Sequence, residues 1–587
     1  MAEKRATPAV SGDLARGSDI SHEDVQATFC AVLVDTWVNQ GVTAAFIAPG
    51  SRSTPLTLAL MADDRVHIDV FHDERSAAFA ALGFGVATGR PAVAVCTSGT
   101  AAAHFHAAVI EADLSGVPLL VCTADRPPEL RDVGAPQTID QVKLFGAAVR
   151  WFHDPGVPSG ATAETWPSMA ARSVAATSGV NPGPVHLNLP FREPLVGRID
   201  SRLSAANDRR GNDLVHVSGR PVLSEEDVRH LERRLGSGRR GVIVAGRGCG
   251  DPHVVAALAR AWQWPVIADS RSRCQGSDLS VVHADALLRI PEFVSCVRPE
   301  VVLRLGESPS SKVLNQWIAS LAADECHVSA RPDVFDPQHR VALHITADPT
   351  DLCRRLSAQR SRSSPEVHDH VERWLGADRV ARAVLAESDD EALPDGPAVA
   401  RALVAGLPAG TQLVLSSSMP IRDLEWFAGD CSHLVVHANR GANGIDGVVA
   451  SGVGVARGSG APTVVLIGDV ALIHDASTMM SLGSLDADLR IVVVDNDGGG
   501  IFHHLPQAAI VGPEVFEKVY GTPHGVDLVA MSLAAGLPAE TVARRNDLHR
   551  LVRSRGPRLI RVATDRVADV AAHRRYQERI AAAVRAL

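Results

Sequence analysis

Short apolar runs alternate with longer alanine-rich stretches along most of this chain. Between residues 23 and 198 the runs AAFIAPG, AVAVCTSG, PLLVCTAD and GPVHLNLP are separated by stretches such as Arg75 to Thr88, which has helical spacing. Apolar runs of this length are typical of strands buried on both faces, and the stretches between them of crossover helices. The pattern therefore predicts a parallel sheet wrapped by helices.

The same alternation occurs twice more, so we expect an α/β protein with three doubly wound parallel-sheet domains. The second set of strands is GVIVAGRGCG, PVIAD, VVLRLG and ALHITAD, and the third is QLVLSSS, HLVVHAN, PTVVLIGD, RIVVVDND and PRLIRVATD. The first connecting segment is polar and has no periodicity, whereas the second combines a Ser/Arg-rich stretch, one amphipathic helix and the acidic run ESDDEALPDG. The predicted organisation is a disordered leader at 1–21, a first domain at 22–198, a linker at 199–224, a central domain at 225–356, a second linker at 357–397 and a third domain at 398–587.

Size and charge narrow the possible functions. A chain of 587 residues is too long for one hydrophobic core, and a net charge of −9 argues against a broad nucleic-acid-binding surface. No apolar run approaches the roughly 18 residues that span a bilayer, and the N-terminus lacks the apolar core of a signal peptide. The nine cysteines occur singly, as in a reducing compartment. We expect a cytoplasmic protein that acts on small molecules and has no membrane span.

Oxygen-bearing side chains follow two successive strands of the third domain. Val464–Ile467 ends in Gly468 and Asp469, and 27 positions after Asp469 the next strand ends in Asn496. One strand and one crossover helix fill that interval, so both side chains are expected at the same edge of the sheet. Carboxylate and amide oxygens suit a hard cation, and the glycines that follow allow close backbone approach, which makes the peptide oxygen of Gly498 a third candidate ligand.

Each of these two motifs alone is also an ordinary strand-end turn. Together, at this spacing, they resemble the thiamine diphosphate signature GDG followed some two dozen residues later by NN. The sequence departs from it at Val470 and Asp495, and neither departure removes a metal ligand. The resemblance implies bound thiamine diphosphate and Mg²⁺, with Mn²⁺ as the alternative, and it includes Gly468, Asp469 and Asn496 in the cofactor site.

Thiamine chemistry also requires a carboxylate against the aminopyrimidine ring. In enzymes that carry the signature, this residue is a glutamate after the second strand of the first domain. Here the strand Val66 to Phe71 leads into Asp73 and Glu74 and then into a helix. Glu74 is the candidate, and Asp73 is the neighbour most easily mistaken for it. The local alternative is an acid in the first helical turn that favours the helix dipole.

Six further segments narrow the resemblance to one family. They are APGSRSTPL, HDERSAAFAALG, TSGTA, TADRPPELRDVGAPQTI, NRGANGIDG and DNDGGGIF. As a set they resemble the 2-succinyl-5-enolpyruvyl-6-hydroxy-3-cyclohexene-1-carboxylate (SEPHCHC) synthases of menaquinone biosynthesis. The resemblance implies a transferase that decarboxylates 2-oxoglutarate on thiamine diphosphate and adds the succinyl-semialdehyde carbanion to isochorismate in a 1,4-addition.

The resemblance also implies a set of site residues. Each substrate carries two carboxylates, so a pocket rich in cations and hydroxyls is expected. A catalytic role falls to Glu74, Gln137 and Arg422. The implied contacts are Ser51, Arg52, Arg126, Gln137 and Lys312 for isochorismate, Ser418 and Arg422 for the distal carboxylate of 2-oxoglutarate, Arg440 in the same pocket, Ile501 and Phe502 on the substrate side, and Ile445 as the wedge that bends the cofactor. Relatives often carry a second basic residue where this chain has Val313, so that contact is not implied here.

Three other interpretations remain open from the sequence. A dinucleotide-binding dehydrogenase is suggested by Gly246-Arg247-Gly248-Cys249-Gly250 with Asp269 about twenty residues on, although the third glycine is misplaced. An acetohydroxyacid synthase or simple 2-keto acid decarboxylase would share Glu74 and Asp469 but not the many arginines. A regulatory protein could keep the fold without the chemistry.

The cofactor must contact both the first and the third domain. In proteins of this kind the two domains come from different subunits. The resemblance therefore implies a homodimer or homotetramer with active sites between subunits.

Overall fold

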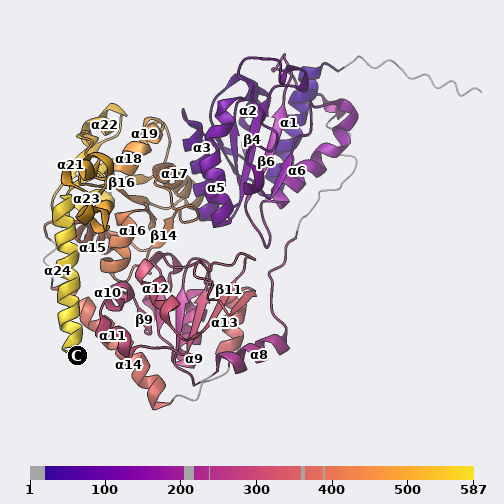
Figure 1. The fold of residues 1–587 in the computed structure, drawn as a ribbon. Coiled ribbons are helices and arrows are strands. Elements are labelled where there is room, and N and C mark those ends of the chain that lie inside the picture. Colours follow the sequence, from indigo (N-terminus) through magenta and orange to yellow (C-terminus); the bar gives the residue numbers. More distant parts are fainter. Residues whose placement is uncertain (1–19, 204–216, 237, 359–363, 388–390) are drawn as a thin grey trace, which may run out of the picture.

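The computed structural model of the chain describes residues 20–203, 217–236, 238–358, 364–387 and 391–587. These residues form three six-stranded sheets in which all pairings between strands are parallel. The predicted fold class is confirmed. Figure 1 shows the first unit in indigo and purple beside the third unit in orange and yellow, with the central unit in magenta below them.

The first unit has the strand order β2-β1-β3-β4-β6-β5. Its strands are β1 (Ala44–Ile47), β2 (His67–Val70), β3 (Ala92–Cys96), β4 (Leu119–Asp125), β5 (Trp151–His153) and β6 (Pro184–Pro190). Its helices are α1 (His22–Asn39), α2 (Thr54–Met61), α3 (Glu74–Thr88), α4 (Thr100–His104), α5 (His106–Ser115) and α6 (Trp166–Ala175). The alternate residues of β3 enter two different cores, one on each face: Val93 and Val95 join one, and Ala92, Ala94 and Cys96 the other. The sheet is thus buried on both faces, as its continuous apolar strands require.

The central unit has a different strand order, β12-β11-β10-β7-β8-β9. Its strands are β7 (Gly241–Ala245), β8 (Val266–Ala268), β9 (Ser280–Val281), β10 (Val301–Leu305), β11 (Asp324–Ser329) and β12 (Leu343–Thr346). Its helices are α8 (Glu225–Leu235), α9 (Pro252–Trp262), α10 (Ala284–Leu288), α11 (Pro291–Cys296), α12 (Lys312–Ser320) and α13 (Pro349–Ser357). In chain order within the unit this corresponds to 3-2-1-4-5-6, the order of dinucleotide-binding sheets.

The third unit repeats the order of the first, as β14-β13-β15-β16-β18-β17. Its strands are β13 (Gln412–Leu415), β14 (Val435–Ala438), β15 (Thr463–Gly468), β16 (Leu489–Asp495), β17 (Ala539–Val542) and β18 (Arg558–Ala563). Its helices are α15 (Gly396–Gly406), α16 (Met419–Asp423), α17 (Val448–Ser459), α18 (Asp469–His474), α19 (Ala476–Leu482), α20 (Gln507–Ile510), α21 (Pro513–Phe516), α22 (Leu528–Ala534), α23 (Arg545–Val552) and α24 (Arg566–Arg585).

Much of the predicted second linker is a long helix, α14 (Pro365–Ala386). Its Trp374 is fully buried in a core that also contains Tyr576 of α24. The helix therefore joins the central unit to the end of the chain (Figure 1). The exact bounds of the predicted domains stay a prediction. Residues 1–19 of the predicted leader lie outside the described residues, and Ser21, at its end, caps α1.

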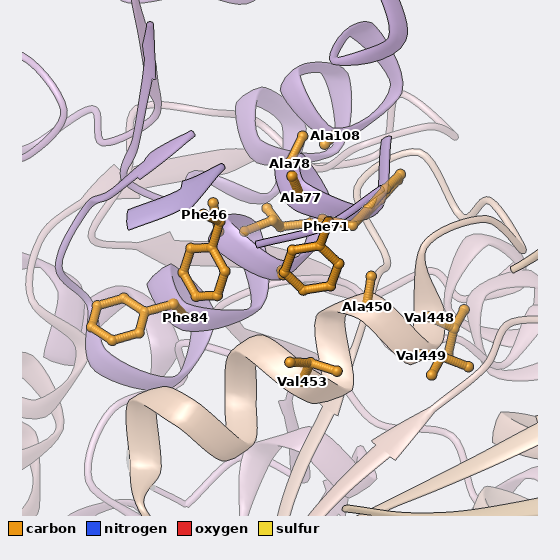
Figure 2. Close-up of a cluster of buried hydrophobic side chains, with 14 of the residues drawn as sticks. Phe46, Phe71, Ala77, Ala78, Phe84, Ala108, Val448, Val449, Ala450 and Val453 are labelled. Carbon is orange, nitrogen blue, oxygen red and sulfur yellow. The ribbon is translucent and has the colours of Figure 1, made fainter. Parts of the chain in front are cut away.

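The first and third units pack against each other through α3 and α17. Figure 2 shows Phe71 and Phe84 of the first unit facing Ala450 and Val453 of α17 within one buried cluster. Glycines allow the two helices to touch at the backbone. A Cβ atom on Gly83 would lie 2.1 Å from the carbonyl oxygen of Ser451, and one on Gly454 would lie 1.9 Å from that of Ala80. Such distances exclude any side chain at either glycine unless the helices separate.

Within the described part of the chain, no helix combines the length and the apolar character needed to cross a bilayer.

Candidate active site

A cavity of about 530 Å³ opens in the third unit, at the carboxyl ends of β13, β15 and β16. This edge is where ligands bind in open parallel sheets. The lining includes Ser416 to Ser418 after β13, Gly468 and Asp469 after β15, and Asn496 and Gly498 after β16, together with Ile445. The predicted cofactor and metal residues of the third unit thus line a single cavity.

Asp469 begins α18 and is 2% exposed. Its carboxylate accepts the backbone N–H groups of Val470 at 2.7 Å, Asn496 at 3.0 Å and Gly498 at 2.9 Å. Burial raises the pKa of this carboxyl, and the three backbone donors oppose the shift. The bonds hold the carboxylate in one orientation beside Asn496.

Several oxygen atoms around the cavity are left without a partner. Within the described ranges, Oδ1 of Asn496 and the hydroxyls of Ser416 and Ser417 are buried and form no hydrogen bond. Leaving a buried acceptor unpaired costs about 1–3 kcal/mol, so these atoms favour an electropositive or hydrogen-bonding ligand. Together with the Asp469 carboxylate they form a donor set that fits a hard divalent cation and a diphosphate. The neighbouring Asp495 pairs instead with Arg561.

Three cations from two units surround adjoining cavities. Arg422 of α16 and Arg440, which follows β14, line the same cavity as Asp469. Lys312, the first residue of α12, lines one further cavity of about 850 Å³ with Arg422 and another of about 590 Å³ with Arg440. Burial lowers the pKa of both arginines, and Arg271 adds to the effect at Arg440. The fold thus gathers the predicted acid-binding cations of the central and third units.

The remaining predicted residues of the third unit complete these walls. Ile501 and Phe502 line the cavity beside Asp469. Ser418 has a φ of 74°, in the left-handed region, and its carbonyl oxygen accepts a bond from the Arg422 guanidinium. The strained backbone at Ser418 therefore contacts Arg422, and both residues are predicted to bind the distal carboxylate of 2-oxoglutarate.

The predicted isochorismate residues of the first unit gather at the equivalent edge of their own sheet. Arg126, after β4, donates to Oγ of Ser98 at 2.6 Å, and Nε2 of Gln137 donates to the carbonyl oxygen of Ser98 at 3.0 Å. Arg52 is buried and its guanidinium already donates to Glu193 at 2.7 Å. The exposed Ser51 precedes it. None of these residues lines the cavity around Asp469 in the described chain.

Glu74 also lies outside that cavity. It is the first residue of α3, and Asp73 caps the helix by accepting the N–H of Arg75 at 2.8 Å. Arg75 in turn contacts His474, the last residue of α18, whereas Asp469 is the first. The first unit therefore packs on the end of α18 opposite the cavity. In the described chain, Glu74 and the Asp469 donor set therefore do not line one cavity.

Family models for thiamine pyrophosphate enzymes match all three units. The N-terminal TPP binding domain matches residues 27–144, the middle domain residues 221–414 and the C-terminal TPP binding domain residues 426–562. Thiamine pyrophosphate is another name for thiamine diphosphate. The chain is also similar to curated proteins named 2-succinyl-5-enolpyruvyl-6-hydroxy-3-cyclohexene-1-carboxylate synthase. The protein from Myxococcus xanthus is 39% identical, with 96% of this chain and 99% of the relative covered. The proteins from Thermobifida fusca and Geobacillus thermodenitrificans are 42% and 40% identical, with 94% of this chain and 98% and 96% of the relatives covered.

The chain belongs to the SEPHCHC synthase family. The predicted family and the thiamine diphosphate dependence are confirmed. The alternatives of an acetohydroxyacid synthase and of a simple decarboxylase lose their support, because near-full-length relatives carry the SEPHCHC synthase name.

Four further residues line the SEPHCHC synthase cavity that sequence reasoning did not single out. Nε2 of His573 lies 2.8 Å from Oδ1 of Asp423, next to Arg422, and the rings of His504 and His573 lie 4.8 Å apart. Burial raises the pKa of Asp423, lowers that of His504 to about 4 and raises that of Asp569 to about 6. His573 and Asp569 lie on the last helix, far along the sequence from the motifs, so no local pattern could have pointed to them.

The dinucleotide interpretation of the central unit is not supported. At the point where its strand order reverses, Arg247 pairs with Glu307, and Arg271 pairs with both Glu307 and Asp269. A Cβ atom on Gly246 would meet the carbonyl oxygen of Glu307 at 1.8 Å, so this glycine serves internal packing rather than a pyrophosphate.

Proposed function

We propose that this chain is a SEPHCHC synthase that transfers the succinyl-semialdehyde unit of 2-oxoglutarate to isochorismate, with loss of carbon dioxide, in menaquinone biosynthesis. The observation that carries the proposal is the arrangement of Lys312, Arg422 and Arg440 around cavities that adjoin the Asp469 donor set. Both substrates are dianionic acids, and cations that meet a carboxylate form the stronger class of hydrogen bond.

In the proposed complex, Asp469, Asn496 and the peptide oxygen of Gly498 hold Mg²⁺, or alternatively Mn²⁺, against the diphosphate. Thiamine diphosphate, when bound, supplies an electron sink for the charge left by loss of carbon dioxide. Glu74 holds a proton at the aminopyrimidine nitrogen, and Ile445 with Gly468 shapes the cofactor's position.

Residues at the carboxyl edges of the first and third sheets hold the substrates, together with Lys312 of the central unit. Ser418 and Arg422 bind the distal carboxylate of 2-oxoglutarate, with Arg440 beside it. Ile501 and Phe502 exclude water from the reacting end. Isochorismate is bound by Lys312 and by a first-unit group, namely Ser51, Arg52, Arg126 and Gln137.

A direct assay tests this function. Purified protein with thiamine diphosphate and Mg²⁺ is incubated with 2-oxoglutarate and isochorismate, and the product is identified by mass. Parallel reactions receive pyruvate alone or pyruvate with isochorismate. We expect a product only with 2-oxoglutarate and isochorismate together. Equal turnover of pyruvate would contradict the proposal. We place the reaction in the cytoplasm, and this placement stays a prediction.

Replacing Arg422 should selectively weaken the binding of 2-oxoglutarate. We expect Arg422→Ala to raise the KM for 2-oxoglutarate roughly 100-fold, because losing one partner of a half-buried, hydrogen-bonded charge pair costs about 2–5 kcal/mol. The preference for 2-oxoglutarate over pyruvate, which lacks the distal carboxylate, should fall with it. Arg550→Ala, at an exposed arginine of α23, is the matched control. An unchanged preference would remove Arg422 from the substrate site.

The active site is proposed to form between two chains of a homodimer or homotetramer. Its support is that Glu74 packs away from the cavity that contains Asp469 in one chain. Glu74→Gln and Asp469→Ala should each be inactive, yet mixed dimers should hold one site in which both residues are native.

Exchange of subunits between the two inactive variants should therefore restore about a quarter of the wild-type activity at full mixing. The measurement is the rate of product formation after co-refolding, with native mass spectrometry to verify mixed dimers. Mixed dimers without activity would place both residues in one chain's site.

A further inference from the structure

Glu425 extends from the third unit to the central unit. It lies in the π-helical segment Leu424–Ala428, which continues directly from α16. Its carboxylate contacts the hydroxyl of Ser310 and lies 3.5 Å from Oγ of Ser270, and both serines belong to the central unit. A single side chain thus bridges the two units at their interface.

Each end of this bridge is close to a cation of the substrate pocket. Glu425 follows Arg422 by three residues, so both lie on the same face of a continuous helical segment. Ser310 precedes Lys312 by two residues, and Ser311 caps α12 by accepting the N–H of Leu314 at 3.0 Å. The contact between Glu425 and Ser310 is therefore a short connection between Arg422 and Lys312.

Burial, together with one neighbouring carboxylate, favours the neutral form of Glu425. Burial, followed by the neighbouring Asp269 carboxylate, raises the pKa of Glu425 to about 8, against the opposing effects of Ser310, Arg271 and Arg440. A neutral carboxyl at physiological pH keeps its hydrogen bond to Ser310 and leaves Arg440 free to meet a substrate carboxylate.

We propose that Glu425 is a positioning residue that ties the helix bearing Arg422 to the loop bearing Lys312, so that cations of two units hold the two acidic substrates at a fixed separation. The inference rests on the proposed function, because it assigns Lys312 to isochorismate and Arg422 to 2-oxoglutarate. Glu425 lines none of the three cavities that these cations share, so it acts through its neighbours.

A double-mutant cycle on Glu425 and Ser310 tests the connection. We expect Glu425→Ala to raise the KM for isochorismate roughly 10-fold, since one hydrogen bond to a partly buried carboxyl is removed, while kcat changes by less than about threefold. Ser310→Ala should act in the same direction. The double variant should be no worse than Glu425→Ala, because the two changes remove the same contact. Additive effects would overturn the proposal.

The conservative variant separates positioning from general destabilisation. Glu425→Gln keeps a neutral group that bonds Ser310, so its KM for isochorismate should stay within about threefold of wild type. Glu540→Ala, at an exposed acid of the same unit, is the matched control. A Glu425→Gln variant as impaired as Glu425→Ala would exclude a role for this hydrogen bond. If Glu425→Ala does not fold, Ser310→Ala and Glu425→Gln still decide the question.

Two measurements keep this inference distinct from the function on which it rests. Calorimetric binding of thiamine diphosphate with Mg²⁺ should be unchanged in every variant, because Glu425 lies outside the Asp469 cavity; a loss of cofactor affinity in Glu425→Ala would overturn the positioning role. Wild-type protein that forms no product from 2-oxoglutarate and isochorismate would instead contradict the proposed function. In that case the cycle is measured as free energies of unfolding, and additivity there again rejects the link.

Discussion

Asp469→Ala is expected to abolish cofactor binding while leaving the protein folded. The change removes a negatively charged metal ligand, and it also leaves the backbone N–H groups of Asn496 and Gly498 without their acceptor. Losing a charged ligand together with its three charge-assisted bonds, the third from the N–H of Val470, should weaken thiamine diphosphate binding by about 100-fold or more. Isothermal calorimetry with thiamine diphosphate and Mg²⁺ measures the affinity, and circular dichroism verifies the fold.

The control for this result is Glu540→Ala, at an exposed acid on β17. It should bind the cofactor as the wild type does. Asp469→Ala with wild-type affinity would contradict the assigned metal site, and the unpaired oxygen of Asn496 would then need another explanation.

Glu74→Gln is expected to bind the cofactor but not to activate it. The glutamine amide keeps the size of the side chain, so cofactor affinity should change by less than about tenfold, whereas loss of a general acid–base group lowers proton transfer by about 10² to 10⁴. Deuterium exchange at the thiazolium carbon, followed by NMR, measures the step directly.

The adjacent acid provides the matched control. Asp73 accepts the N–H of Arg75 and caps α3, and asparagine retains that acceptor. Asp73→Asn should therefore exchange deuterium at the wild-type rate. Normal exchange in Glu74→Gln, or lost exchange in Asp73→Asn, would move the catalytic role away from Glu74.

The parts of the fold that sequence predicted are those with a local cause. Unbroken apolar runs gave the strands, and the turn residues after β15 and β16 placed Asp469 and Asn496 at one edge of the sheet. The rule that parallel strands end together needs no knowledge of distant contacts. For the same reason Asp73 and Glu74 fell at the start of a helix, where the structure has them.

The parts that sequence missed depend on contacts between distant segments. His573 reaches Asp423 across 150 positions of the chain, and nothing in the pattern of α24 distinguishes it from an ordinary surface histidine. The segment that contains Trp374 is predicted from sequence to be a connection with one amphipathic helix, and the pattern does not indicate that this side chain is fully buried in a core shared with α24.

The backbone contact between α3 and α17 restricts how the enzyme can open. With Gly83 and Gly454 seated against opposing carbonyl oxygens, the first and third units of one chain cannot slide or hinge past each other without breaking their shared core. Admission of substrate and escape of product must then use smaller movements elsewhere, such as in the short 3₁₀ helix Gly500–His504, which carries Ile501 and Phe502. A compound that binds against this short helix and holds it in place would block turnover without separating the two units.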